Sequence, residues 1–254
     1  KDFSIDATLN LSTLKNEVLS LGDNVQPITS GAMSSSFSDS PSITKPGEAI
    51  GSFYGYKING FDADGNFIFA DTDNNGSVDA NDKVILGNPI PDFSYGLNVT
   101  MSYKDFDLTM FFQGVQGNEI FNQKKYTYYF DYSNNCVTDV LNAWTKNNQN
   151  TNIPIMKTQN TDGGNSLPSE FYIEDGSYFR CKNLQLGYNF PKSILNKISF
   201  NKLRVYAGVQ NLFTITNYSG YDPEVSSNAL FSRGIDSASY PNARTFTFGF
   251  NASF

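Results

Sequence analysis

Residues 93–113 read Phe-Ser-Tyr-Gly-Leu-Asn-Val-Thr-Met-Ser-Tyr-Lys-Asp-Phe-Asp-Leu-Thr-Met-Phe-Phe-Gln. Apolar and polar side chains alternate on both sides of Lys104-Asp105, with one exception at Phe111. Because successive side chains of a strand point to opposite faces, this pattern predicts two strands that each have one apolar and one polar face. The polar pair Lys104-Asp105 predicts a tight turn between them, so the two strands should form an antiparallel hairpin.

The same alternation occurs in four other segments. The six expected strands cover about residues 2–14, 92–103, 105–117, 176–190, 202–214 and 242–254. Each is longer than the roughly 5–6 residues of a typical soluble strand. Their length instead matches the roughly 9–11 residues with which a tilted strand crosses a bilayer. The pattern therefore predicts an all-β fold, either a soluble antiparallel sheet with one wet face or a transmembrane antiparallel β-barrel.

The lengths of the connections favour the barrel. Two connections are short, whereas the other three are long and cover residues 15–91, 118–175 and 215–241. Short and long connections alternate, as do the periplasmic turns and extracellular loops of outer-membrane barrels. Six strands leave an unpaired strand at each edge, which lipid does not tolerate. We therefore expect a C-terminal portion of a longer barrel, completed by strands of a missing N-terminal part in preference to other copies of the chain.

Composition excludes several classes of function. The 254 residues carry a formal net charge of −7, so the basic face that a nucleic-acid partner requires is not expected. The chain contains no His, which removes His-ligated zinc and Ser-His-Asp catalysis. Asp222 and Glu224 are the nearest approach to a paired-carboxylate site, but no proton-relay residues accompany them. We therefore expect no enzyme.

A calcium-loop pattern occupies residues 71–82, which read Asp-Thr-Asp-Asn-Asn-Gly-Ser-Val-Asp-Ala-Asn-Asp. The six positions that supply ligands in such loops are held by Asp71, Asp73, Asn75, Ser77, Asp79 and Asp82. Gly76 stands where the loop needs a sharp turn. Hard oxygen ligands at these offsets favour Ca²⁺. The alternative is an acidic, hydrated turn that binds nothing specific.

The expected role of Ca²⁺ is structural. It would brace the long segment 15–91, which we expect to have little apolar content of its own. Nearby Asp62, Asp64 and Gly65 resemble half of a second calcium loop, but the continuation is missing.

The 118–175 segment is rich in aromatic residues. Candidate contacts to a ligand or to a lid protein are Tyr126, Tyr128, Tyr129 and Tyr132. Exposed aromatic rings can stack on sugar rings or peptide side chains, but they also form girdles at bilayer interfaces or pack a loop. The spacing of Val137, Val140, Leu141 and Trp144 predicts one short amphipathic helix. Cys136 and Cys181 are expected to be unpaired thiols, although an oxidising exterior would permit a bridge.

Several motifs resemble one protein family. Residues 177–188, S-Y-F-R-C-K-N-L-Q-L-G-Y, are similar to the S-Y-L-R-L-K-N-L-T-L-G-Y stretch of SusC/RagA-type TonB-dependent outer-membrane transporters. Further matches, in the family's order, lie at 55–61, 71–82, 87–92, 203–206, 210–214, 218–224, 234–236 and 240–249. The resemblance covers essentially the whole chain. Phe179 and Cys181 depart from the family's aliphatic residues without threatening the assignment.

The resemblance implies a fold and a function. Family members are barrels of about 22 strands with a plugged lumen. They are powered through a TonB box, pair with a SusD-like surface lipoprotein that closes as a lid, and import oligosaccharides or, in some cases, peptides. The chain would supply the last six or so strands. The expected location is the outer membrane of a Bacteroidetes-like Gram-negative bacterium.

The resemblance also implies partners. These are the remaining N-terminal barrel and plug, TonB acting through that absent part, the SusD-like lipoprotein and outer-membrane lipids. The rival interpretation is a soluble extracellular calcium-binding β-sandwich, either an adhesin or a carbohydrate-binding module. That fold would need a second sheet to bury the apolar face of the first.

Overall fold

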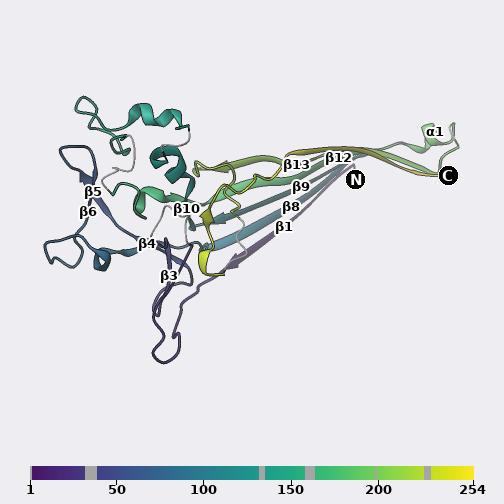
Figure 1. Ribbon diagram of the computed structural model, residues 1–254. Coiled ribbons are helices and arrows are strands. Elements are labelled where there is room, and N and C mark those ends of the chain that lie inside the picture. The colour runs from purple at the N-terminus through teal and green to yellow at the C-terminus, as the bar shows by residue number, and fades with distance from the viewer. Residues whose placement is uncertain (1, 32–38, 132–134, 158–163, 198, 226–229) are drawn as a thin grey trace.

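The computed structural model describes the chain except residues 1, 32–38, 132–134, 158–163, 198 and 226–229 (Figure 1). Its largest element is a six-stranded antiparallel sheet in the order β1-β8-β9-β12-β13-β15. The strands are β1 (Phe3–Thr13), β8 (Phe93–Tyr103), β9 (Phe106–Gln116), β12 (Tyr178–Asn189), β13 (Lys202–Thr216) and β15 (Thr245–Ser253). The expected all-β fold with six long strands is therefore confirmed.

One face of this sheet is apolar across its full width. The register places apolar residues of all six strands side by side, and one such row holds Ala7, Val99, Met110, Leu184, Val209 and Phe246. At the two edges these side chains are open, since Leu9 is 67% and Phe248 80% exposed. The apolar face is therefore as continuous as a hydrophobic core, but no layer of the described residues covers it.

The opposite face is polar. Ser4 and Ser102 share a hydroxyl hydrogen bond of 2.7 Å, and Asp107 pairs with Arg204. Phe111, the exception to the alternation, lies on this face, and its ring covers Gly96, where an added Cβ would lie 3.4 Å away. The exception therefore fills the space that a glycine leaves open on the neighbouring strand.

The short connections are tight. Tyr103 and Phe106 pair directly, and Lys104 adopts a left-handed φ of 53° in the turn between them. The connection from β12 to β13 contains the only described α-helix, α1 (Lys192–Leu195). No described helix has the length and apolar character to cross a membrane. The three long connections gather at the other end of the sheet, where they form one body that we call the cap (Figure 1).

The cap contains three small sheets of its own. One has four strands, β2 (Ile28–Ser30), β3 (Ser42–Thr44), β4 (Ser52–Gly55) and β7 (Val84–Gly87). A second joins β10 (Glu119–Asn122) to β11 (Ile173–Asp175) and to β14 (Ile235–Asp236). The third is a hairpin of β5 (Ile58–Phe61) and β6 (Phe67–Phe69). Because β14 pairs with β10, two of the long connections are hydrogen-bonded to each other.

Short helices complete the cap. A π-helix, η2, spans Tyr126–Phe130. The 3₁₀ helices are η1 (Ala80–Asp82), η3 (Thr138–Asn142), η4 (Glu170–Tyr172) and η5 (Leu230–Ser232). The expected amphipathic helix through Trp144 is wrong, since η3 ends at Asn142 and leaves Leu141 exposed while Trp144 is buried. A 3₁₀ helix has about three residues per turn, so the spacing of an α-helix does not align these side chains.

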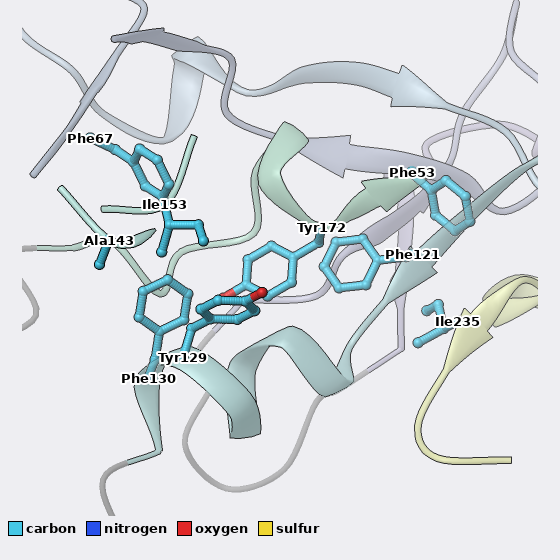
Figure 2. Packing of buried hydrophobic residues seen from close by; sticks show 9 residues of the cluster. All are labelled: Phe53, Phe67, Phe121, Tyr129, Phe130, Ala143, Ile153, Tyr172 and Ile235. Carbon is cyan, nitrogen blue, oxygen red and sulfur yellow. The ribbon is translucent and has the colours of Figure 1, made fainter. Parts of the chain in front are cut away.

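All three long connections contribute to one aromatic core (Figure 2). Its buried members are Phe53, Phe67, Phe121, Tyr129, Phe130, Ala143, Ile153, Tyr172 and Ile235. The rings of Phe121 and Tyr172 stack at 5.0 Å, and neither side chain is exposed. The expectation that segment 15–91 has little apolar content of its own is wrong, because it supplies Phe53 and Phe67. These residues come from separate segments of the sequence and become a core only when the three segments meet.

Candidate functional site

The acidic loop lies in the cap between β6 and β7, and Asp82 closes it. Asp82 is fully buried, and its carboxylate accepts hydrogen bonds from the backbone N–H groups of Thr72 at 2.6 Å and Asp79 at 2.8 Å. The N–H of Asp79, together with those of Thr72 and Asp73, lowers the pKa of Asp82 below its ordinary value. An ionised carboxylate therefore holds the beginning and the end of the loop together.

Asp71 and Asp73 shape the turn at the start of the loop. The Asp71 carboxylate accepts from the N–H of Gly76 at 2.8 Å, and Asp73 accepts from the N–H of Asn75 at 3.0 Å. Gly76 has a φ of 90°, which a glycine adopts without strain. Asp71, Asp73 and Asp82 each offer one carboxylate oxygen, and these three oxygens lie within 4.8 Å of one another. Three hard oxygens at this spacing form a donor set that fits Ca²⁺.

The remaining expected ligands make hydrogen bonds inside the loop. The Asn75 side-chain oxygen accepts from both the N–H and the hydroxyl of Ser77 at 2.8 Å. Asp79 accepts from the N–H of Asn81 at 2.7 Å and thereby caps η1. Asp79 is not part of the group formed by the other three aspartates. Three of the four expected carboxylates thus lie together, and the fourth, that of Asp79, caps η1.

The second, partial calcium motif forms a turn. Asp62 accepts hydrogen bonds from the backbone N–H groups of Asp64 at 2.9 Å and Asn66 at 2.8 Å, and from the Asn66 side chain. The Asn66 donors lower the pKa of Asp62. Within the described part of the chain, the 71–82 loop holds the one group of three acidic side chains close enough to share an ion.

The expected aromatic contacts divide into two kinds. Tyr129 is buried in the aromatic core, packs edge-on against Phe171 at 5.4 Å, and has its pKa raised to about 12 by that burial. Tyr128 is half-buried, and its hydroxyl lies 3.5 Å from the hydroxyl of Tyr221. Tyr126 begins the π-helix, and Tyr132 lies outside the described residues.

An ion-pair network, which sequence reasoning missed, joins the cap to the sheet. Arg180 of β12 is only 2% exposed and pairs with Asp222 and, at 2.7 Å, with Glu224. Lys182 reaches Glu224 at 3.0 Å, and the Asn242 side chain donates to both carboxylates. We call these five residues the Arg180 clamp. Four of them stand in the motifs 177–188 and 218–224, and Asn242 stands in 240–249, but the sequence does not reveal that these motifs meet.

The clamp holds the Asp222 carboxylate in its ionised form. Burial raises the pKa of Asp222, but the Asn242 N–H and the Arg180 guanidinium lower it, and the net result is a pKa below the ordinary value. An aspartate held ionised by an arginine has no proton to donate at neutral pH.

Cys136 is exposed and Cys181 buried, and both thiols are free.

Comparison with known proteins adds to this geometry. The chain is 37% identical to TonB-dependent receptor P3 of Formosa agariphila and 31% identical to TonB-dependent receptor SusC of Bacteroides thetaiotaomicron. Both matches cover the whole chain, but only 27% and 25% of the relatives, so the chain spans about a quarter of their length. No protein-family profile matches the chain.

The fold also has solved counterparts. It is similar to the structure of the RagAB peptide transporter, with a TM-score of 0.79 and 23% identity, and to the RagAB peptide importer in its open-open state, with 0.77 and 22%. Each match covers the whole chain and 27% of the other chain. The relatives are named as receptors. Over its whole length the chain is similar to the SusC/RagA type of TonB-dependent receptors, and these likenesses support its assignment as a C-terminal part of their β-barrel.

Proposed function

We propose that this chain supplies the last six strands and three extracellular loops of an importer in the outer membrane of a Gram-negative bacterium. The observation that carries the proposal is the apolar face of the six-stranded sheet, which is continuous and open at both edges. Water disfavours an exposed apolar surface of that extent, whereas lipid stabilises it. The polar face would then line the wet lumen.

The proposed cargo is an oligosaccharide or a peptide, taken up together with a SusD-like lipoprotein. The description of RagAB as a peptide transporter supports a peptide as cargo, and the resemblance to the SusC/RagA family is the basis for the oligosaccharide and for the lipoprotein. The unpaired edges of β1 and β15 are where the remaining barrel would continue the sheet. TonB would act through the plug in that remaining part, so no bond is made or broken in this chain.

The rival interpretation, a soluble β-sandwich adhesin, needs a second sheet over the apolar face. The open side chains of Leu9 and Phe248 count against it. Fractionation of the native protein tests the two proposals against each other. We expect it in outer-membrane fractions, in company with a lipoprotein, and running as a heat-modifiable barrel on gels. A monomer that stays soluble without detergent would contradict the importer and favour the adhesin.

We also propose that the acidic loop binds Ca²⁺ as a structural ion. Asp71, Asp73 and Asp82 would provide carboxylate oxygens, with Asn75, Ser77 and Asp79 as the remaining expected ligands. The ion would brace the connection between β6 and β7 and take no part in transport chemistry. A calorimetric titration of the intact protein with Ca²⁺, repeated with Mg²⁺, tests this. We expect heat from Ca²⁺ only, because Mg²⁺ demands a stricter octahedral site.

A further inference from the structure

Lys124 and Asp236 form a buried ion pair where two of the long connections of the cap meet. β10 and β14 pair in parallel there, with Asn122 opposite Asp236. One residue further along, the Ser237 hydroxyl donates to the Gln123 side chain at 2.7 Å. The two backbones are thus held in register on both sides of the pair, which keeps the Lys124 and Asp236 side chains next to each other.

The ammonium group of Lys124 is held against this carboxylate without a hydrogen bond. The side chains of Lys124 and Asp236 are 5% and 1% exposed, and Nζ lies 3.8 Å from Oδ2, which is contact but not a hydrogen bond. Nζ has no other hydrogen-bond partner among the described residues. The Tyr221 ring covers Nζ, with its centre 3.6 Å away. Two charges buried in this way, without a bond that satisfies the ammonium, are costly.

The two oxygens of Asp236 have different partners. Oδ1 accepts hydrogen bonds from the backbone N–H groups of Ala238 at 3.0 Å and Ser239 at 2.9 Å. Two N–H groups on one oxygen are the arrangement that stabilises an oxyanion. Oδ2, the oxygen nearer to Lys124, accepts from the Tyr218 hydroxyl at 2.6 Å. Burial and the bond to Asp236 raise the pKa of Tyr218, so this hydroxyl keeps its proton.

We propose that Lys124 and Asp236 join in an intramolecular amide, an isopeptide bond between Nζ of the lysine and Cγ of the aspartate. The proposal goes beyond the importer function and does not depend on it. The amide replaces two buried charges with one neutral group, which removes the cost of burying them. Because the fold holds the two groups in contact, they react as if at very high concentration, and no second molecule has to reach the buried site.

The reaction balances without a further reagent. The Lys124 ammonium gives one proton to Oδ2, and the neutral amine then attacks Cγ. The negative charge develops on Oδ1, where the N–H groups of Ala238 and Ser239 already point. The nitrogen gives up a second proton, which the Tyr218 hydroxyl relays to Oδ2. The Cγ–Oδ2 bond breaks, Oδ2 leaves as water with both protons, and nothing is oxidised or reduced.

The bond would tie the segments 118–175 and 215–241 together permanently. A cross-link between residues that are far apart in the sequence stabilises a fold chiefly by restricting the unfolded chain. The aromatic core joins the same segments, but only as long as they stay folded. The cross-linked cap would therefore reopen only in part when its core is disrupted.

The test is a tryptic digest of the intact, detergent-purified protein, analysed by mass spectrometry. An unmodified chain gives the separate peptides 105–124 and 234–244. Trypsin does not cleave after an acylated lysine, so the cross-linked chain gives peptide 105–125 joined to 234–244, lighter than their sum by one water. We expect this joined pair to be the main form, with the branch between Lys124 and Asp236 in the fragment spectra.

Three variants sharpen the test. Lys124→Met should abolish the joined pair, whereas Lys146→Met, at an exposed lysine of the same cap, should leave it unchanged. General acid–base catalysis contributes about 100-fold or more to a rate, so Tyr218→Phe should leave a fraction of free peptide 234–244 that the native protein lacks. An unchanged yield in Tyr218→Phe would contradict the relay by Tyr218.

Two results would overturn the cross-link itself. One is a native digest with free peptides 105–124 and 234–244 and no joined pair, which would leave Lys124 and Asp236 as an ion pair. The other is a branch that maps to Lys125. The native digest decides between these outcomes even if a variant fails to fold. Neither result bears on the importer, which the fractionation described above tests separately.

Discussion

Phenylalanine behaves in opposite ways in the sheet and in the cap. In β15 the rings of Phe246, Phe248 and Phe250 are exposed, whereas Phe53 and Phe121 in the cap are completely buried. Because the residue type is the same, the difference in exposure reflects the surroundings of each region. The cap buries its rings against one another, as a water-soluble domain does. The sheet leaves its rings outside, which suits a surface that faces lipid.

The two regions are also held together by different forces. The sheet depends on its backbone ladders, because no layer of the described residues packs against its apolar face. The cap depends on an aromatic core that all three long connections share. The Arg180 clamp links the regions, since Arg180 belongs to β12 and Asp222 to the cap. Substitutions at these three places should separate the regions experimentally.

The largest effect is expected in the cap core. Phe121→Ala removes a fully buried ring that stacks on Tyr172, which should destabilise the cap by about 3–5 kcal/mol. Limited proteolysis should then cut the cap while the barrel keeps its heat-modifiable migration. Leu141→Ala, at an exposed side chain in the same segment, should change stability by less than about 0.5 kcal/mol. Loss of the barrel together with the cap would show that the two regions are not separate.

The second largest effect is expected in the Arg180 clamp. Arg180→Met leaves the buried Asp222 carboxylate without its cation, and removal of one partner of a buried pair costs about 3–5 kcal/mol. We expect the low end of that range, because Glu224 is partly exposed. Proteolysis of the segment 215–241 measures the effect. Lys182→Met removes a half-exposed partner of Glu224 and should cost about 0–1 kcal/mol. Equal effects of the two substitutions would contradict the central role of Arg180.

The apolar face of the sheet is tested by Val99→Arg. Val99 lies in the middle of β8 on the apolar face, where an arginine at the bilayer midplane costs about 2–4 kcal/mol. Asn98→Arg places the same charge on the polar face of the same strand and should be nearly neutral. Urea unfolding of the barrel in lipid vesicles measures both. If the two variants unfold alike, the apolar face does not meet lipid.

Acid should destabilise the Arg180 clamp by less than these substitutions do. The pKa of Asp222 is depressed in the folded protein, so its stabilising contribution is present above the ordinary aspartate pKa of about 3.9 and is lost as the pH falls through the lower folded value. Cleavage within 215–241 should therefore increase below about pH 4. Other carboxylates titrate in the same range, so Asp222→Asn is the reference. That variant should lose part of the pH dependence, and an unchanged pH profile would argue against the clamp.

The smallest effect is expected at the acidic loop. Asp71→Ala removes a proposed Ca²⁺ ligand and two hydrogen bonds to the N–H groups of Asn75 and Gly76. The loop should become more sensitive to protease, whereas the barrel should remain folded. A chelator should have the same effect on the native protein and none on the variant. Protease sensitivity that does not change with chelator or substitution would contradict a structural ion.

Local patterns predicted a large part of this fold. The period-two alternation located all six long strands, because the alternation of side chains in a strand is a property of the backbone alone. The turn at Lys104-Asp105 followed from the two strands that flank it. The acidic loop was also readable, since its residues lie within one short segment, and three of its aspartates do converge.

The cap could not be read in the same way. Phe53, Phe121 and Ile235 come from three connections that are far apart in the sequence, and none stands in an amphipathic repeat. The spacing from Val137 to Trp144 suggested an α-helix, whereas the structure has a 3₁₀ helix that ends at Asn142 and a buried Trp144 beyond it. Similarly, nothing in the two motifs indicates that Arg180 meets Asp222.

The sequence by itself determined the sheet: its strands, its two faces and the end at which the long connections lie. These depend on neighbouring residues, whose geometry the backbone dictates. Only the tertiary structure decided the cap core and the Arg180 clamp. Those features require contacts between distant segments, and the free energy of such contacts comes from burial and charge pairing that no local pattern encodes.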